Sequence, residues 1–188
     1  MSRDQAYELL TNHVQSPSLI KHCLAVEAAM CGLARYFREN ETSWGMAGLL
    51  HDADWETTRE TPERHTLELM DWLEEFDLED DDSIKSAILA HNHFHNGHQP
   101  PQNMMEWSLY CCDELTGLIV AITLVTPDKK IASVDVASIL RKMGQSNFAA
   151  GVDRDQIRLC EENLGISLEE FISIVLEAMQ GISGELGL

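Results

Sequence analysis

The segment Met46-Ala47-Gly48-Leu49-Leu50-His51-Asp52 is an apolar run that ends in an adjacent histidine and aspartate. The run has the composition of a buried helix, so the His–Asp pair is predicted to lie at the edge of the core. Imidazole and carboxylate groups rarely enter a core without a partner, because leaving either group unpaired there is unfavourable. This segment therefore predicts an internal helix with a polar site beside it.

The same feature recurs in other segments, because His22, His65, His91 and Asp113 each lie on or beside the apolar face of a predicted helix. Taken singly, each residue has a structural interpretation, such as a hydrogen-bonded core histidine, a helix-capping aspartate or a helix end. Taken together, imidazoles and carboxylates that converge from separate segments indicate a shared partner. The simplest such partner is a metal ion.

Helical periodicity runs through nearly the whole chain and predicts an all-α fold. The sequence shows no β-hairpin signal, no internal repeat and no linker rich enough to divide it. We therefore predict one helical bundle over residues 1–188. Its metal-site core spans about 16–126, and the helices of 127–188 are expected to pack on that core.

Three helix starts precede the candidate ligands of the first half. Ser16-Pro17 combines a capping residue with a proline at the first helical position, and it opens the segment that carries His22. Thr42 or Ser43 is expected to cap the short helix that ends at the His–Asp pair. Thr61-Pro62-Glu63 repeats the cap-plus-proline pattern and predicts the start of the next helix.

The second half of the bundle follows the same pattern. The acidic stretch 77–82 is expected to be a solvated turn and a helix start, and 83–92 a helix. Residues 93–102 read as a loop by composition. Residues 104–126 are apolar on most sides, which predicts a central buried helix with Asp113 in its middle.

The charge balance limits the classes of partner. A net charge of −19 over 188 residues argues against a broad electrostatic grip on polymeric nucleic acid or on an anionic membrane. The apolar stretch Leu115–Val125 is too short to span a bilayer. The charge says less about small anionic substrates, since a metal and a few local cations can outweigh the global field.

The cysteines indicate the compartment. There are five, an odd number, and none forms a C-x-x-C pair, as is typical of thiols packed as small hydrophobes in a reducing environment. The polar N-terminus Met-Ser-Arg-Asp has no signal-peptide core. We therefore expect a cytoplasmic protein.

The order and spacing of the candidate ligands resemble the HD-domain superfamily of metal-dependent phosphohydrolases, in particular its uncharacterised predicted hydrolases. The resemblance runs from about His22 to Asp113. It implies a helical bundle in which one divalent metal is held by His22, His51, Asp52 and Asp113. Two-metal members carry two further histidines between the pair and the last aspartate, and His65 and His91 stand at those places. The resemblance thus implies a binuclear centre bridged by Asp52 and a hydroxide.

The mixed nitrogen and oxygen ligands suit one or two divalent transition-metal ions, namely Fe, Mn, Ni, Co or Zn, better than Mg. Two departures from relatives stand out. Gly97-His98-Gln99-Pro100-Pro101 lacks the Gly-Tyr-Pro signature of the cyclic-di-GMP phosphodiesterases, so that substrate is not supported. Ala53-Asp54 replaces an apolar residue and a glycine, which places an extra carboxylate near the site.

Four residues are candidates for catalytic work. Asp52 would support a metal-activated water as nucleophile. Asp54 would either orient that water or serve as a helix cap. Arg64 and Lys129 are candidates to seat a phosphate, although each also reads as an ordinary surface cation. In addition, one of the histidines in 93–98 is a candidate acid or base on a flap.

Three functions stay open at this point. The first is a phosphohydrolase acting on a small phosphorylated metabolite or nucleotide. The second is a di-iron oxygenase, because myo-inositol oxygenase and its relatives use the same ligand order. The third is a non-catalytic metal-binding or sensor domain. The apolar positions of the C-terminal helix could pack on this chain or, in a homodimer, on a second copy: Ile172, Val175, Met179 and Ile182.

Overall fold

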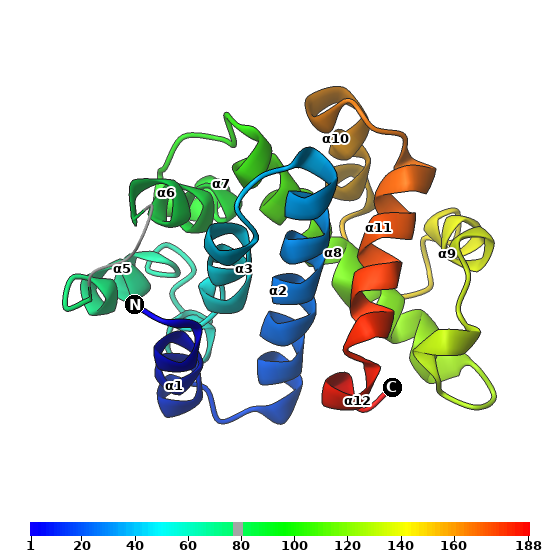
Figure 1. Cartoon of the computed structure of the whole chain (residues 1–188), viewed down its shortest axis with the longest axis horizontal. Helices are drawn as coiled ribbons and strands as arrows, with labels where there is room; N and C mark the ends of the chain where they lie inside the picture. Colours follow the sequence, from blue (N-terminus) through cyan, green and yellow to red (C-terminus); the bar gives the residue numbers. More distant parts are fainter. Residues whose placement is uncertain (77–80) are drawn as a thin grey trace.

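The computed structural model describes residues 1–76 and 81–188, so most of the acidic stretch 77–82 lies outside the described residues. The described chain is all-α, which confirms the predicted fold class (Figure 1). In chain order the helices are α1 (Arg3–His13), α2 (Pro17–Phe37), α3 (Glu41–Leu50), α4 (Trp55–Thr58), α5 (Leu67–Leu73), α6 (Asp81–His91), α7 (His93–Asn96), α8 (Met104–Val125), η1 (Ile131–Ser133), α9 (Val136–Met143), α10 (Arg154–Leu164), α11 (Leu168–Gly181) and α12 (Ser183–Leu186).

Helix α2 lies at the centre of the bundle, with α3 on one side and α11 on the other (Figure 1). It begins as predicted, because the Ser16 hydroxyl accepts the Leu19 N–H at 3.4 Å and Pro17 occupies the first turn. Its last turn closes on Arg38 in the left-handed conformation. Since α2 is covered on both sides, the face that carries His22 looks into the bundle.

Helix α3 starts earlier than predicted. Asn40, not Thr42 or Ser43, is the cap, because its side-chain oxygen accepts the N–H groups of Thr42 at 2.9 Å and Ser43 at 3.2 Å. One short amide thus satisfies two open donors of the first turn, which leaves both hydroxyl residues inside the helix.

Helices α2 and α3 approach each other closely at Gly48. A Cβ atom at this position would lie 2.8 Å from the Val26 carbonyl oxygen and 2.9 Å from the Glu27 nitrogen. Only a residue without a side chain fits against the α2 backbone at that distance. This contact sets the distance between His22 on α2 and His51 at the end of α3.

The helix predicted from Thr61 is also corrected. Residues 61–66 form turns, and α5 begins only at Leu67. The reason is Asp54, whose buried carboxylate accepts the N–H groups of Thr66 at 2.8 Å and Leu69 at 3.1 Å and so caps α5 from outside the segment. Thr66 itself has φ +74°, a conformation that reverses the chain immediately after His65.

Helix α8 is the predicted central helix, capped by Asn103, whose side chain accepts the Glu106 N–H at 3.1 Å. Its 22 residues, with a mean hydropathy of 1.6 in the most apolar window, are long and apolar enough to cross a membrane by length and composition alone. The apolar segment is therefore longer than the stretch Leu115–Val125 considered in the sequence. However, 61% of that window is buried by the rest of the chain, as expected of a core helix packed against α2, α6 and α10.

The C-terminal helices pack on this core. Helix α11 lies against α2 (Figure 1), where a Cβ at Gly32 would be 3.1 Å from the Ala178 Cβ. Helix α10 lies against α8, and Gln156 donates to the Tyr110 carbonyl at 2.7 Å. Of the α11 positions weighed for a second copy, three are fully buried within this chain: Ile172, Val175 and Met179. A homodimer stays a prediction.

Candidate metal centre

The structure brings all six predicted ligands into one cluster. His22 comes from α2, and the adjacent pair His51-Asp52 directly follows α3. His65 comes from the turns before α5, His91 ends α6, and Asp113 lies in the middle of α8. Elements that are distant in sequence therefore converge at the point where α2, α3, α6 and α8 pack together.

One half of the cluster contains His22, His51 and Asp113. The Nε2 atom of His22 lies 2.9 Å from Asp113 Oδ1 and 3.7 Å from Asp52 Oδ2. The Nε2 atom of His51 lies 3.5 Å from Asp113 Oδ1 and 3.6 Å from Asp52 Oδ2. These two ring nitrogens are 3.2 Å apart.

The other half contains His65 and His91. Their Nε2 atoms lie 3.2 Å and 3.6 Å from Asp52 Oδ1, and they are 3.2 Å from each other. The two halves are contiguous, since His51, Asp52 and His91 offer ligand atoms within 4.8 Å of one another. Asp52 thus presents one carboxylate oxygen to each half, which is the arrangement of a bridging ligand.

The rings are oriented by hydrogen bonds on their other nitrogen. The Nδ1 atom of His51 lies 2.8 Å from the Gly48 carbonyl oxygen, and that of His91 lies 2.5 Å from the Ile88 carbonyl oxygen. A carbonyl only accepts, so both Nδ1 atoms carry a proton, and in the neutral ring each Nε2 presents a lone pair. The contact of the His22 Nδ1 is longer, at 3.5 Å to the Thr116 hydroxyl.

These lone pairs supply a test of whether a metal fits. Within each half, two Nε2 atoms lie 3.2 Å apart, and two neutral rings that both present lone pairs there would not bond each other. A proton or a cation must therefore lie between them. Adjacent ligands on an ion with bonds of about 2.1 Å are separated by roughly 3.0–3.4 Å, close to the separations in both halves. The residues present fit a divalent metal.

The pKa values of the cluster also show that its carboxylates need a positive charge beside them. Burial raises the pKa of Asp52, but the nearby His51 and the hydrogen bonds from His65 and His91 hold that pKa well below its usual range. Burial lowers the pKa values of His51 and His65, but the neighbouring aspartates outweigh it and raise both to about 9. Without a metal, protons compensate the carboxylates. For His91, burial dominates and the pKa is lowered.

Asp54 does not face the cluster, contrary to the role of orienting a water. It is fully buried, and one of its oxygens accepts the His65 Nδ1–H at 2.7 Å. The other oxygen accepts the two backbone N–H groups that begin α5. Asp54 therefore holds His65 in the tautomer and orientation that present Nε2 to Asp52, as an outer carboxylate does for a metal-bound histidine.

We expect Asp54→Asn to lower metal affinity by about 10–100-fold. The amide oxygen would keep the backbone N–H groups of α5, so the amide nitrogen would face the His65 Nδ1, donor against donor. His65 would then move its proton to Nε2, the atom that must be free. A metal titration against a competing chelator measures this effect. The matched variant is Asp71→Asn, an exposed aspartate, and equal affinities in the two variants would contradict the assignment.

A cavity of about 330 Å³ opens over the cluster. Besides the ligands, its wall includes six residues that the sequence did not single out: Trp55, Pro62, Asn92, Tyr110, Glu114 and Gln156. Asn92 donates to the Pro62 and His65 carbonyls at 2.9 and 3.0 Å. Burial and the neighbouring Asp113 raise the pKa of Glu114 to about 7. The only signal in the sequence for these wall residues is that two of them directly follow a predicted ligand: Asn92 follows His91, and Glu114 follows Asp113.

The structure does not bring the two predicted phosphate-seating cations to this cavity. Arg64 is exposed and lies 3.8 Å from Asp71 on the outer surface. Lys129 is exposed in the turn after α8, with φ +53°. Both have the surroundings of surface cations, so nothing in the geometry supports a role in seating phosphate.

The histidine-rich segment is only partly the predicted loop, because His93–Asn96 forms the short helix α7. Of its histidines, His95 lines the cavity. The His93 Nδ1 lies 3.0 Å from the Ala90 carbonyl oxygen, and its ring contacts Tyr110 with centroids 5.4 Å apart. His95 is therefore the histidine of this segment that can reach a bound molecule.

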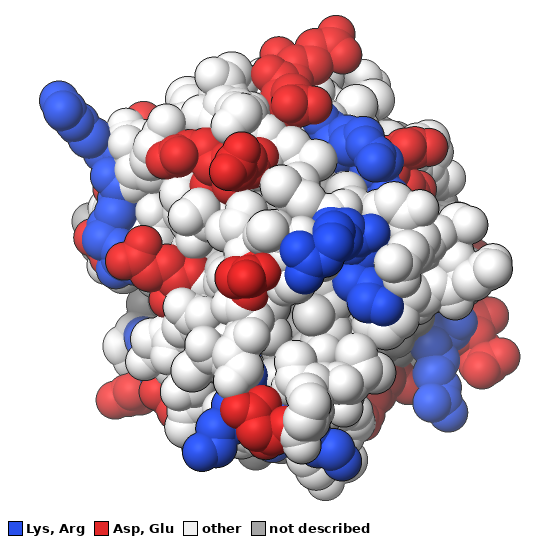
Figure 2. Space-filling view, turned by 90° about the vertical axis from the view of Figure 1, so that its right-hand side faces the viewer, with Lys and Arg blue, Asp and Glu red and all other residues white. Residues whose placement is uncertain are grey.

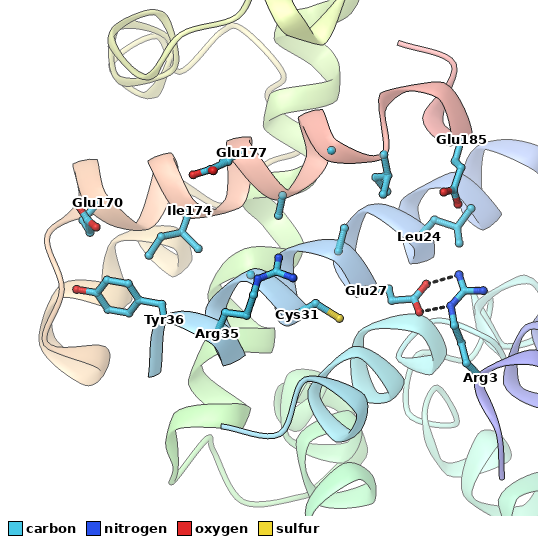
Figure 3. Close-up of a pocket in the computed structure, with 15 residues that line it drawn as sticks. Arg3, Leu24, Glu27, Cys31, Arg35, Tyr36, Glu170, Ile174, Glu177 and Glu185 are labelled. Carbon is cyan, nitrogen blue, oxygen red and sulfur yellow. Dashed lines mark hydrogen bonds and ion pairs between the residues drawn. The ribbon is translucent and has the colours of Figure 1, made fainter. Parts of the chain in front are cut away.

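A larger cavity, of about 860 Å³, lies elsewhere (Figure 3). It is a groove between α2 and α11, and its labelled wall includes the ion pair of Arg3 and Glu27, at 2.6 and 2.8 Å. Its α2 residues, centred near Cys31, lie on the face opposite His22 by helical geometry. It contains none of the six ligands, so size alone does not identify the chemical site.

The comparisons with known proteins agree with this geometry. The family model of the HD domain matches residues 19–121, more than half of the chain, which confirms the resemblance. The matched range contains all six residues of the cluster. No curated protein and no solved structure matches the chain.

Proposed function

Since the chain belongs to the HD-domain family, we propose that it is a metal-dependent phosphohydrolase that acts on a small phosphorylated metabolite or nucleotide. One observation carries the proposal. The two carboxylate oxygens of Asp52 face two separate pairs of histidine Nε2 atoms, which is a ligand set for two ions rather than one.

The six residues of the cluster would hold the ions, and mixed nitrogen and oxygen ligation favours Mn, Fe, Co, Ni or Zn. When bound, such ions neutralise phosphoryl charge and lower the pKa of water toward neutrality. The chain contributes orientation: the Gly48 and Ile88 carbonyls and Asp54 fix three of the rings before any substrate binds. His95, which lines the cavity, would give a proton to the leaving oxygen.

Several features support a small substrate in a reducing cytoplasm. The cavity over the cluster has room for a small molecule, at about 330 Å³. On the face shown in Figure 2, basic and acidic side chains are interspersed, with no continuous basic surface there for a nucleic acid. All five cysteines are free thiols.

Elemental analysis followed by a substrate screen tests the proposal. We expect close to two transition-metal ions per chain, and hydrolysis of phosphomonoesters or small phosphodiesters once the metal is restored. Two iron atoms with oxygen consumption and no phosphate release would instead establish the oxygenase alternative. Full metal content without either activity would favour a binding or sensor domain, and no metal after reconstitution would reject all three.

The same screen tests His95. An alkyl phosphate needs protonation of its leaving oxygen far more than a nitrophenyl phosphate does. His95→Gln should therefore slow the alkyl ester by about 100-fold or more and the nitrophenyl ester much less. His98→Gln, which changes a histidine outside the cavity wall, is the control. Equal losses on the two esters would remove the proton-donor role.

A further inference from the structure

The part of the cavity wall that lies beyond the metal ligands has an unusual composition. It presents aromatic and apolar groups, notably Trp55, Phe94 and Tyr110, together with the carboxylate of Glu114. Trp55 and Phe94 are 37% and 77% exposed, although large apolar rings are normally covered. These rings are therefore available to a bound molecule.

Within the described residues, this wall lacks the permanently charged cations lysine and arginine. Arg154 lies two residues before the wall residue Gln156, but it is already committed, because it donates to the carbonyls of Gln145, Phe148, Ala149 and Val152. A substrate with several phosphates would have only the metal cluster to neutralise it, so a single phosphate is favoured.

Glu114 is the unmatched charge in this wall. One of its oxygens accepts the Asp153 backbone N–H at 3.0 Å. Within the described residues, no lysine or arginine forms an ion pair with it. A half-buried carboxylate without a cation is unfavourable, and it lies one residue from the metal ligand Asp113. A bound cation at this position would be stabilised.

Rings beside a carboxylate form a recognised type of ammonium site. Aromatic faces attract cations through their quadrupole, most strongly when the cation is weakly hydrated, as alkylammonium groups are. The acidic protein, with a net charge of −19, attracts cations and repels polyanions. A nucleobase would also stack on Trp55, but it would leave Glu114 without a counter-charge.

We propose that the cavity selects phosphate esters whose other end carries an alkylammonium group, with Glu114 as its counter-ion and with Trp55 and Phe94 as its aromatic walls. The inference rests on the proposed hydrolysis of a phosphate ester. It adds the substrate class: a zwitterion with its phosphate on the metal cluster and its ammonium group at the mouth of the cavity. Because Glu114 directly follows Asp113 in α8, we expect a short spacer of two or three carbons between the two ends.

A pair of isosteric alcohols tests the ammonium site without any turnover. Choline and neohexanol have the same shape, but a quaternary nitrogen in the first is a carbon in the second. Saturation-transfer NMR on zinc-saturated protein gives both dissociation constants. We expect choline to bind about tenfold more tightly than neohexanol. Equal binding, or tighter binding of neohexanol, would overturn the inference.

Two variants of the cavity wall test whether it causes the preference for choline over neohexanol. Glu114→Gln keeps the hydrogen bond to Asp153 and removes the charge, so the preference for choline should fall below about threefold. Glu177→Gln, which removes one exposed charge from the groove shown in Figure 3, should leave it unchanged. Trp55→Leu should weaken the binding of choline more than the binding of neohexanol. If Glu114→Gln and Glu177→Gln behave alike, the preference is a property of the global field and the site is wrong.

The hydrolytic step is measured separately in the same preparation. Phosphocholine should inhibit hydrolysis of nitrophenyl phosphate about tenfold better than neohexyl phosphate. Hydrolysis without this preference would leave the proposed function standing and overturn the ammonium site. Binding of choline over neohexanol without hydrolysis of any phosphate ester would support the site and refute the hydrolase. Tighter binding of adenosine monophosphate than of phosphocholine would assign the walls to a nucleobase instead.

Discussion

Asp52→Ala is expected to give a folded protein that no longer retains metal and no longer turns over substrate. Asp52 is the one residue whose oxygens face both halves of the cluster, so its loss removes a ligand from each ion. Removing an outer partner of a ligand already lowers affinity by about 10–100-fold, and a shared ligand should matter more. Metal content after dialysis, with circular dichroism for the fold, measures the result.

The fold should persist because, among the residues that the structure describes, the ion pairs of the Asp52 side chain are with the four histidine rings of the cluster. Asp71→Ala is the matched variant, since it removes an aspartate from the outer surface, where the side chain is 71% exposed. It should keep full metal content and turnover. If Asp52→Ala did so too, the assignment of this cluster as the metal centre would be wrong.

Gly48→Ala is expected to destabilise the protein more than any other single-methyl change on α3. The new Cβ would lie 2.8–2.9 Å from backbone atoms of α2, which have no rotamer to move away. Overpacking of this kind costs about 1–3 kcal/mol, and with a backbone neighbour we expect about 2–3 kcal/mol, or a fall in Tm of roughly 4–12 °C. Thermal unfolding measures it.

The substitution should also weaken metal binding, because the Gly48 carbonyl orients His51 and the α2–α3 distance sets the His22–His51 pair. Gly117→Ala in the middle of α8 is the control, since nothing lies within 4 Å of its Cβ. There alanine should stabilise the protein by about 0.5–1 kcal/mol through helix propensity. Similar Tm values for the two variants would show that α2 and α3 can separate at no cost.

The six residues of the cluster could be predicted from the sequence because each is a polar group on or beside an apolar segment with helical spacing. Which of them would pair was not visible, since His65 meets His91, and His22 meets His51, only through packing. Residues of the cavity wall such as Trp55, Tyr110 and Gln156 have no local signal of any kind. Their role arises where α4, α8 and α10 come together.

The fold was predictable where local signals act alone, as at Ser16-Pro17 and along α8. It was not predictable where a distant group decides the local structure. The cap-plus-proline pattern at Thr61-Pro62 is real, but Asp54 takes the N–H groups that a helix starting there would have used later. A pattern within one segment cannot show a hydrogen-bond partner from another segment.

Besides lining the cavity, Asp113 and Glu114 place two carboxylates in the middle of the apolar helix α8. During synthesis, before α2 and α3 have packed on it, this helix is a 22-residue apolar segment of membrane-spanning length. An aspartate at the centre of such a segment opposes its insertion into a bilayer by about 2.5–3.5 kcal/mol. The carboxylates in the middle of α8 would therefore disfavour insertion of the nascent helix into a bilayer before the bundle closes around it. An apolar residue at position 113 would remove a metal ligand and this safeguard together.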